Sequence, residues 1–187
     1  MLRLTGGEFR GRSIHAPTHQ NTRPTQAKLR QALFNSLQIY IPDARVLDLF
    51  AGTGALGFEA LSRGAAFAVF VESSKEAAKL IQKNADTLGV SDRIEILALP
   101  VEKAHAALSH SAPFEIVLAD PPYAAAWELK LLQEFPWNDW LAADGHLCLE
   151  WGSQKSKVAE LPENVPFLVK VREKNYGDSV LTTYRKS

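Results

Sequence analysis

The sequence predicts an α/β fold in which helices cover both faces of a doubly wound, mostly parallel sheet. Three observations lead to this prediction. Short apolar runs alternate with helical segments over residues 46–151, which is typical of parallel strands buried on both faces. The first apolar run leads directly into a glycine-rich turn at residues 52–57 that opens a helix. The last two apolar runs flank a polar turn at residues 175–178, which predicts a C-terminal antiparallel hairpin.

Apolar periodicity and turn residues give the expected element boundaries. Parallel strands are expected at residues 46–50, 67–71, 93–98, 114–119 and 146–151. The hairpin strands follow at residues 167–173 and 179–185, so the sheet is expected to have seven strands. Helices are expected at residues 55–62, 102–108 and 127–135. A further helix opens with the capping box Ser73-x-x-Glu76 and is expected to bury Ala77, Leu80, Ile81 and Leu88.

Residues 1–24 are expected to form a basic hairpin and loop that precede the main domain at residues 25–187. The hairpin consists of a strand at residues 2–5, a Gly6-Gly7 turn and a strand at residues 8–14. A helix should follow, with Thr25 as its N-cap and an apolar face formed by Leu29, Leu33, Leu37 and Ile41.

Composition restricts the class of protein. The chain has 187 residues, 46% of them hydrophobic, with 21 basic and 21 acidic side chains, which is typical of a soluble globular domain. It has no apolar stretch of the roughly 18 residues that a membrane span needs, and its first residues lack the apolar core of a signal peptide. We therefore expect a cytoplasmic monomer with no membrane partner.

Metal and disulfide chemistry are not expected. The single cysteine, Cys148, excludes internal disulfides and a multi-cysteine zinc site. The five histidines have no ligand spacing between them, so the sequence predicts no metal site.

The neutral total hides a basic N-terminal region. Residues 1–41 carry six basic side chains and one acidic one, Glu8, so their formal charge is +5, and the rest of the chain carries −5. Such a region is either a solvated surface or an electrostatic footprint for nucleic-acid phosphates. The six basic residues are Arg3, Arg10, Arg12, Arg23, Lys28 and Arg30.

The glycine-rich turn predicts a nucleotide-type cofactor site. Gly52, Gly54 and Gly57 satisfy the dinucleotide fingerprint, and their missing Cβ atoms let a ligand approach the backbone. Glu72 ends the next strand, 20 residues after Gly52, where its carboxylate can accept hydrogen bonds from ribose hydroxyls. Both NAD(P) and S-adenosylmethionine fit this geometry. Asp48 favours S-adenosylmethionine, because a carboxylate repels a pyrophosphate and attracts the ammonium group of the methionyl end.

A second motif, Asp120-Pro121-Pro122-Tyr123, follows the fourth strand at the edge where open α/β sheets bind ligands. The two prolines remove two N–H donors, so nearby carbonyl groups face the site as acceptors. The Asp120 carboxylate and the Pro121 carbonyl can accept the hydrogens of an exocyclic amine while Tyr123 stacks on the base. The lone pair of the nitrogen then stays available to attack a sulfonium methyl group in line. The predicted catalytic residues are therefore Asp120, Pro121, Pro122 and Tyr123.

These motifs together resemble a known family. Residues 120–123 resemble the motif of class I methyltransferases that act on exocyclic amines, and the chain is similar to the RsmD family of bacterial 16S rRNA guanine-N2 methyltransferases. The resemblance rests on residues 6–12, 22–25, 30–35, 47–57, 59–65, 120–123 and 176–178. It implies a seven-stranded Rossmann-like methyltransferase fold. It also implies methyl transfer from S-adenosyl-L-methionine to N2 of one guanine in 16S rRNA, of the guanine-966 type, within the small ribosomal subunit or its assembly intermediate.

The expected site residues follow from the motifs and this resemblance. Cofactor contacts are expected from Asp48, Phe50, Ala51, Gly52, Thr53, Gly54, Glu72 and Asp120. Basic residues of the N-terminal region are expected to grip RNA phosphates and orient the target base, namely Arg10, Arg12, Arg23, Lys28 and Arg30. The chain departs from the family pattern after the third strand, where residues 97–102 lack the Asp or Asn that commonly holds the adenine amino group. A backbone group is the alternative there.

Other functions remain open from the sequence. Adenine N6 or a protein glutamine N5 is an alternative acceptor, and the basic region favours a nucleic acid over glutamine without separating adenine from guanine. An NAD(P)-dependent oxidoreductase shares the glycine-rich turn but leaves residues 120–123 unexplained. A catalytically silent RNA-binding module is a further alternative.

Overall fold

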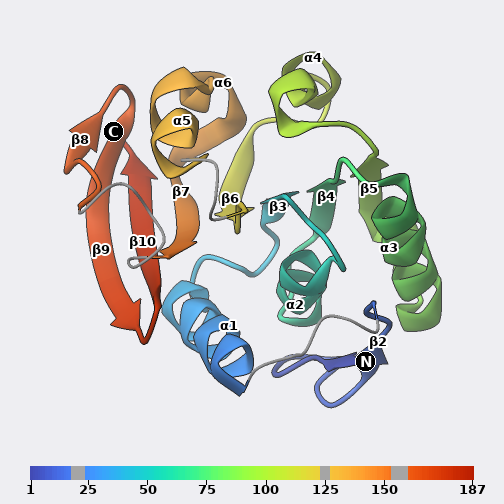
Figure 1. Ribbon diagram of the computed structural model, residues 1–187. Helices are drawn as coiled ribbons and strands as arrows, with labels where there is room; N and C mark the ends of the chain where they lie inside the picture. The colour runs from blue at the N-terminus through green and yellow to red at the C-terminus, as the bar shows by residue number, and fades with distance from the viewer. Residues whose placement is uncertain (18–23, 123–126, 153–159) are drawn as a thin grey trace.

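The centre of the protein is one large sheet, seen in a computed structural model that describes residues 1–17, 24–122, 127–152 and 160–187. The strands lie in the order β5-β4-β3-β6-β7-β10-β9-β8 (Figure 1). Pairing is parallel from β5 to β7 and antiparallel from β7 through β10 and β9 to β8. The strands are β3 (Arg45–Leu49), β4 (Phe67–Val71), β5 (Ile94–Leu97), β6 (Phe114–Ala119), β7 (Leu141–Gly152), β8 (Asn164–Val165), β9 (Leu168–Tyr176) and β10 (Ser179–Lys186).

Helices cover both faces of this sheet. Figure 1 shows α1, α2 and α3 on one side and α4, α5 and α6 on the other. The first layer consists of α1 (Pro24–Leu37), α2 (Ala55–Ser62) and α3 (Lys75–Leu88). The second consists of α4 (Ala104–Leu108), α5 (Trp127–Glu134) and α6 (Trp137–Trp140). Two 3₁₀ turns, at Ser91–Arg93 and Val101–Lys103, flank β5.

Side chains alternate along the strands, so the sheet carries a hydrophobic core on each face. On β3, Val46 belongs to the core under α1–α3, whereas Leu47 belongs to the core under α4–α6. Asp48 stands where the alternation would place another apolar residue of the first core. It pairs with Leu118 of β6, which pairs with Cys148 of β7, and both of these belong to the first core. The register therefore turns the Asp48 carboxylate towards the α1–α3 side.

The predicted doubly wound sheet with a C-terminal hairpin is confirmed, and some boundaries differ. β4, β6 and α2 match the ranges expected from the sequence. β7 begins at Leu141 rather than residue 146, because Leu141 pairs with Phe114 ahead of a register irregularity. β8 is an additional, eighth strand. β8 consists of two residues and lies in the segment between Pro162 and Pro166. A strand of two residues is too short to show a periodic pattern in the sequence.

Three further boundaries differ near the glycine-rich turn and the first helix. β3 ends at Leu49, because Phe50 adopts the left-handed conformation with a φ of 61°. α1 begins at Pro24, so Thr25 lies within its first turn and is not the N-cap; a proline is favourable there because its missing N–H would lack a helical partner. The N-cap of α3 is Ser74 rather than Ser73, since the Ser74 hydroxyl accepts from the Ala77 N–H. The buried face of α3 shifts accordingly to Ala78, Ile81, Asn84, Ala85 and Leu88.

The N-terminal hairpin is shorter than the sequence predicts. β1 (Leu2–Arg3) and β2 (Ser13–Ile14) have two residues each, and a long turn joins them in place of the Gly6-Gly7 turn. The turn wraps around the end of α2, where Ser62 accepts from the Glu8 N–H at 2.6 Å and from the Phe9 N–H at 2.9 Å. Phe9 and Ile14 are buried in the core under α1–α3. The division of the chain after residue 24 stays a prediction.

A buried charge network fixes this N-terminal turn to α1 and α2. Glu59 of α2 is fully buried, and its carboxylate accepts from the N–H and the hydroxyl of Thr5. Arg63 donates to the same carboxylate at 2.9 Å, and the Nε atom of Arg30 lies 3.4 Å from it. Because two guanidinium groups converge on one buried carboxylate, the loss of that carboxylate leaves both without charge compensation.

We expect Glu59→Ala to lower the free energy of unfolding by about 3–5 kcal/mol, the usual cost of removing one partner from a buried ion pair. Urea denaturation measures this change. Glu134→Ala removes an exposed glutamate from the end of α5 and should change stability by less than about 0.5 kcal/mol. Equal, small effects of both substitutions would contradict the structural role of Glu59.

Candidate active site

Two adjoining cavities open at the carboxyl edge of the parallel strands. The larger has a volume of about 580 Å³ and the smaller about 270 Å³. Phe50 and Asp120 line both, so the cavities share a wall. The rest of the larger cavity is formed by Val71–Ser73, Pro100–Glu102, Pro121–Pro122 and Trp127. The rest of the smaller cavity is formed by Leu2, Leu29–Arg30, Asp48, Ala51–Thr53, Ala55–Leu56 and Glu150.

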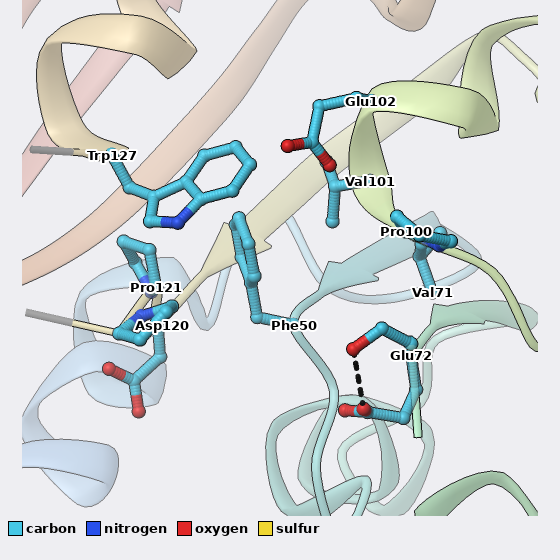
Figure 2. A pocket seen from close by; sticks show the side chains of 11 residues that line it. Phe50, Val71, Glu72, Pro100, Val101, Glu102, Asp120, Pro121 and Trp127 are labelled. Carbon is cyan, nitrogen blue, oxygen red and sulfur yellow. Dashed lines mark hydrogen bonds between the residues drawn. The ribbon is translucent and has the colours of Figure 1, made fainter. Parts of the chain in front are cut away.

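Aromatic and aliphatic side chains form the walls of the larger cavity. Figure 2 shows Phe50 in the middle of the lining, with Trp127 and Asp120 on one side and Glu72 and Pro100 on the other. The rings of Phe50 and Trp127 meet edge to face, with centroids 4.9 Å apart. A space of this volume, with aromatic and aliphatic walls and the carboxylates of Glu72, Glu102 and Asp120 at its border, suits a planar ring that carries a hydroxylated sugar.

The three glycines of the turn have different roles. Gly52 has a φ of +54°, and a Cβ atom there would have no neighbour closer than 4.0 Å, so the space beside it is open to a ligand. A Cβ on Gly54 would lie 2.7 Å from the Phe58 ring, and one on Gly57 would lie 2.2 Å from the Phe70 ring. Gly54 and Gly57 are therefore required for the close packing of α2 against the sheet. Among the three, Gly52 lines the smaller cavity, and a ligand contact at Gly52 and Gly54 stays a prediction.

Asp48 holds the start of α2 in place. Its carboxylate is buried and accepts from the Gly57 N–H at 2.9 Å. Burial raises the pKa of Asp48 to about 7; the Gly57 hydrogen bond opposes this rise, and the charge of Glu72 adds to it. Asp48 also lines the smaller cavity, where a cationic group would restore the charged form of its carboxyl.

Glu72 connects the glycine-rich turn to the start of α3. One carboxylate oxygen accepts from the Gly52 N–H and the other from the Ser74 N–H, both at 2.7 Å. The oxygen bound to Ser74 also accepts from the Ser73 hydroxyl at 3.4 Å, whereas the oxygen bound to Gly52 keeps a further lone pair, and the side chain borders the larger cavity. Glu72 can therefore hold the loop and still accept hydrogen bonds from a ligand's hydroxyl groups.

Asp120 stands between the two cavities, directly after β6. Water reaches it from the cavities, but protein surrounds its other sides. This burial, with the charges of Glu150 and Asp48, raises the pKa of the Asp120 carboxyl to about 8. Pro121 is buried and Pro122 is exposed. Tyr123, the last residue of the motif, lies outside the described residues.

The basic residues predicted to bind RNA are in different environments. Arg10 and Lys28 are exposed, and Arg23 lies outside the described residues. Arg12 donates to the Thr87 and Leu88 carbonyl groups at the end of α3, where a cation is favoured by the helix dipole. Arg30 is buried and lines the smaller cavity, so its environment differs from that of a phosphate-binding surface residue.

Two features of Arg30 were not evident from the sequence. It donates to the Arg3 carbonyl at 2.7 Å and pairs with Glu59, which buries its charge. Its Nε–H group has no hydrogen-bond partner among the residues that the structure describes. This Nε atom is buried and lies 3.4 Å from the Glu59 carboxylate, so the ion pair compensates its charge without a well-aligned hydrogen bond.

Glu150 is a candidate site residue that the sequence motifs do not predict. It is half-buried near the end of β7 and lines the smaller cavity together with Asp48 and Asp120. The available signal was its position, because an acidic residue follows the apolar run of β7 just as Asp120 follows that of β6. Leu2, in the same lining, gave no such signal.

Metal-ligand groups and helices that could cross a membrane are both absent from the part of the chain that the structure describes. In it, no three His, Cys, Asp or Glu side chains are grouped closely enough to hold a metal ion. None of the described helices is both long and apolar enough to cross a membrane.

The strand order and the site together define the class of this protein. A glycine-rich turn after the central strand, an Asp-Pro-Pro motif after its neighbour and a C-terminal antiparallel hairpin are the features of the methyltransferase fold. A solved structure of this kind, the putative methyltransferase yhhF from Escherichia coli, is 32% identical with a TM-score of 0.81, covering 100% of this chain and 98% of that chain.

The chain belongs to the RsmD family, as the resemblance of its motifs predicts. The family model described as "Conserved hypothetical protein 95" matches residues 2–185. The putative rRNA methyltransferase YlbH of Bacillus subtilis is 34% identical over 186 residues, covering 99% of both chains. The ribosomal RNA small subunit methyltransferase D of Haemophilus influenzae is 33% identical over 196 residues, covering 98% of this chain and 92% of that protein.

We expect the stability of the ligand-free protein to fall as the pH rises from about 4 to about 7 through Asp48. Its folded-state pKa is about 7, above the unfolded value of 3.8, so in this window the native state binds more protons than the unfolded state. Asp48→Asn keeps an oxygen acceptor for Gly57 and removes the titration.

Urea unfolding at several pH values measures this effect as the difference between wild type and Asp48→Asn. The variant should lose less stability than wild type between pH 4 and pH 7. The loss of the Asp48 charge also lowers the pKa of Asp120, which changes the difference in the same direction. Parallel stability curves for the two proteins would contradict the raised pKa.

Proposed function

We propose that this protein transfers a methyl group from S-adenosyl-L-methionine to N2 of one guanine in 16S rRNA, of the guanine-966 type. The substrate is the small ribosomal subunit or its assembly intermediate. One observation carries the proposal: Asp120 and Phe50 line both cavities. A donor that spans the two cavities would therefore have its reactive centre beside the Asp120 carboxylate, where an acceptor at the rim of the smaller cavity can reach it. The names of the relatives as rRNA methyltransferases support the choice of substrate.

The residues present fit S-adenosyl-L-methionine. The larger cavity takes the adenosine part, with its ring among Phe50, Pro100 and Val101 and its ribose hydroxyls on Glu72. The amino-acid end enters the smaller cavity, where the carboxyl group of Asp48 attracts its ammonium group. Its carboxylate is matched by the start of α2, whose backbone dipole favours an anion, and by the positive charge of Arg30, which lines the same cavity.

When bound, S-adenosyl-L-methionine supplies a methyl group on a sulfonium ion, and transfer to N2 breaks the C–S bond and leaves a neutral thioether. Asp120 and the Pro121 carbonyl accept the hydrogens of the guanine amine and orient its lone pair, and Tyr123 stacks on the base. The sulfonium charge favours the ionised form of Asp120. After transfer this charge is gone, the pKa of Asp120 returns towards 8, and its carboxylate takes up the proton that N2 releases.

The same site disfavours a nicotinamide dinucleotide. The pyrophosphate of such a cofactor would lie over the glycine-rich turn, against the smaller cavity that Asp48, Asp120 and Glu150 line. Repulsion between the anionic pyrophosphate and these carboxyl groups would oppose binding.

RNA contacts are proposed for the exposed cations of the N-terminal region. Arg10 and Lys28 are exposed, and Leu2 of the same region forms part of the rim of the smaller cavity. Phosphates held by these cations, and by Arg23, would bring a guanine flipped from its stack to the rim beside Asp120. Arg12 attaches this region to the end of α3 through its hydrogen bonds to the Thr87 and Leu88 carbonyl groups. Arg30 attaches it to α2 through its ion pair with Glu59.

Mapping of methylated guanines in 16S rRNA tests the proposed function. We expect one guanine to lose its N2-methyl group in cells without the protein, and purified protein with S-adenosyl-L-methionine to restore it on their small subunits. Asp120→Asn should restore it at a single-turnover rate lower by at least about 100-fold, with most of the cofactor affinity retained. Methylation at an adenine, or no methylation, would contradict the proposal.

The RNA contacts are tested by the salt dependence of subunit binding. Replacing Arg10 and Lys28 together by Ala should lower the slope of log affinity against log salt by about 0.7–0.9 for each phosphate that the protein no longer neutralises. Lys103→Ala is the matched control: it removes an exposed cation just before α4, outside the N-terminal region, and should leave the slope unchanged. A slope that neither variant changes would place the RNA on another surface.

A further inference from the structure

We propose that Glu150 reads the N1–H group of the target guanine and thereby makes the enzyme selective for guanine over bases without that hydrogen. This inference rests on the proposed function, because it assigns a residue to the acceptor side of the same site. It gives a role to the one acidic lining residue of the smaller cavity that the cofactor assignment leaves unused.

Strand order places Glu150 on the acceptor side. The acidic side chains at this edge come from adjacent strands in the order β4, β3, β6 and β7, as Glu72, Asp48, Asp120 and Glu150. Neighbouring strands lie about 4.8 Å apart, so Glu150 is about three strand spacings from the ribose position at Glu72. The methyl donor extends from β4 towards β6, and β7 is the next strand beyond Asp120.

Register places Glu150 on the same face as Asp48 and Asp120. Asp48, Leu118 and Cys148 pair side by side across β3, β6 and β7. Asp120 lies two residues after Leu118, and Glu150 lies two residues after Cys148. Two residues are one full period of side-chain alternation in an extended chain. Both side chains therefore reach the smaller cavity, and the charge of Glu150 raises the pKa of Asp120 because the two carboxyl groups share that space.

The chemistry of the acceptor edge matches a second carboxylate. Guanine presents N1–H beside its N2 amine, two donors on one edge of the ring. With the amine hydrogens on Asp120 and the Pro121 carbonyl, N1–H needs a further acceptor, and a carboxylate offers only acceptors when ionised. Adenine has a bare nitrogen at N1, which a carboxylate repels. Glu150 would therefore favour guanine in two ways: its carboxylate attracts the N1–H group of guanine and repels the bare N1 atom of adenine.

The base 2-aminopurine tests this role, because it keeps the 2-amino group and has no hydrogen at N1. It also lacks the oxygen at C6, so the informative quantity is the change in the ratio of guanine to 2-aminopurine rates on substitution of Glu150. Glu150→Gln converts one acceptor oxygen into an N–H donor that can pair with a bare N1. The substrates are small subunits assembled around 16S rRNA that carries guanine or 2-aminopurine at the methylated position. The readouts are the single-turnover methylation rate on each substrate and the cofactor affinity measured by calorimetry.

We expect Glu150→Gln to methylate guanine about ten- to a hundredfold more slowly than wild type, the range set by one base-reading contact. Its ratio of guanine to 2-aminopurine rates should fall by at least the same factor, and its cofactor affinity should stay within about twofold of wild type. Glu150→Asp, which keeps the carboxylate, should retain the preference for guanine at a lower rate. Glu134→Gln, an exposed charge loss on α5, should match wild type.

Two results would overturn the inference alone. In the first, the wild-type enzyme methylates guanine, and Glu150→Gln has the same ratio of guanine to 2-aminopurine rates as the wild type. The other is a cofactor affinity that falls in proportion to the methylation rate, which would assign Glu150 to the methyl donor. A wild-type protein that methylates no guanine on either substrate would instead overturn the proposed function, and this inference with it.

Discussion

The hydrogen bond from the Gly57 N–H to the Asp48 carboxylate is the interaction on which the site depends. It fixes the first turn of α2 against the end of β3, at 2.9 Å and in a buried position. Gly57 can lie there because it has no Cβ atom to meet the Phe70 ring. With both ends of the turn fixed, Phe50 is held in a left-handed conformation, and its ring forms the wall between the two cavities.

This arrangement has an energetic cost in the ligand-free protein. Carboxyl groups from β3, β6 and β7 share one cavity, and two of them have pKa values raised to about 7 and about 8. Burial of acidic groups without a cation is unfavourable. The left-handed Phe50 adds strain of about 1–2 kcal/mol. Such costs concentrate at binding sites, where a ligand of opposite charge reverses them.

Much of the fold could be predicted because apolar runs and turn residues that are close together in the sequence determine its strands and helices. β4 is a continuous apolar run and β6 is apolar except at Glu115, and an acidic residue follows each of them. α2 begins directly after Gly54 and ends two residues before Gly64. The site at residues 48–57 and 120–122 could be located for the same reason, since chain direction alone brings the ends of parallel strands to one edge.

The parts that could not be predicted depend on distant contacts. The N-terminal hairpin pattern gave way to a turn because Ser62 and Glu59 of α2 bind its backbone. The sequence suggests a surface cation at Arg30, yet this residue is buried because Glu59, 29 positions further along, compensates its charge. Glu150 needs the register between β6 and β7 before it can be placed beside Asp120.

The central claim is that a row of carboxyl groups at the sheet edge is built for a cationic methyl donor. Calorimetry near pH 7, in buffers with different ionisation enthalpies, tests it by counting the protons released on binding. S-adenosyl-L-methionine should release more protons than S-adenosylhomocysteine, because the sulfonium charge lowers the raised pKa values of Asp48 and Asp120 and the neutral thioether does not. Asp120→Asn should reduce this difference. Equal proton release for the two ligands would contradict the account.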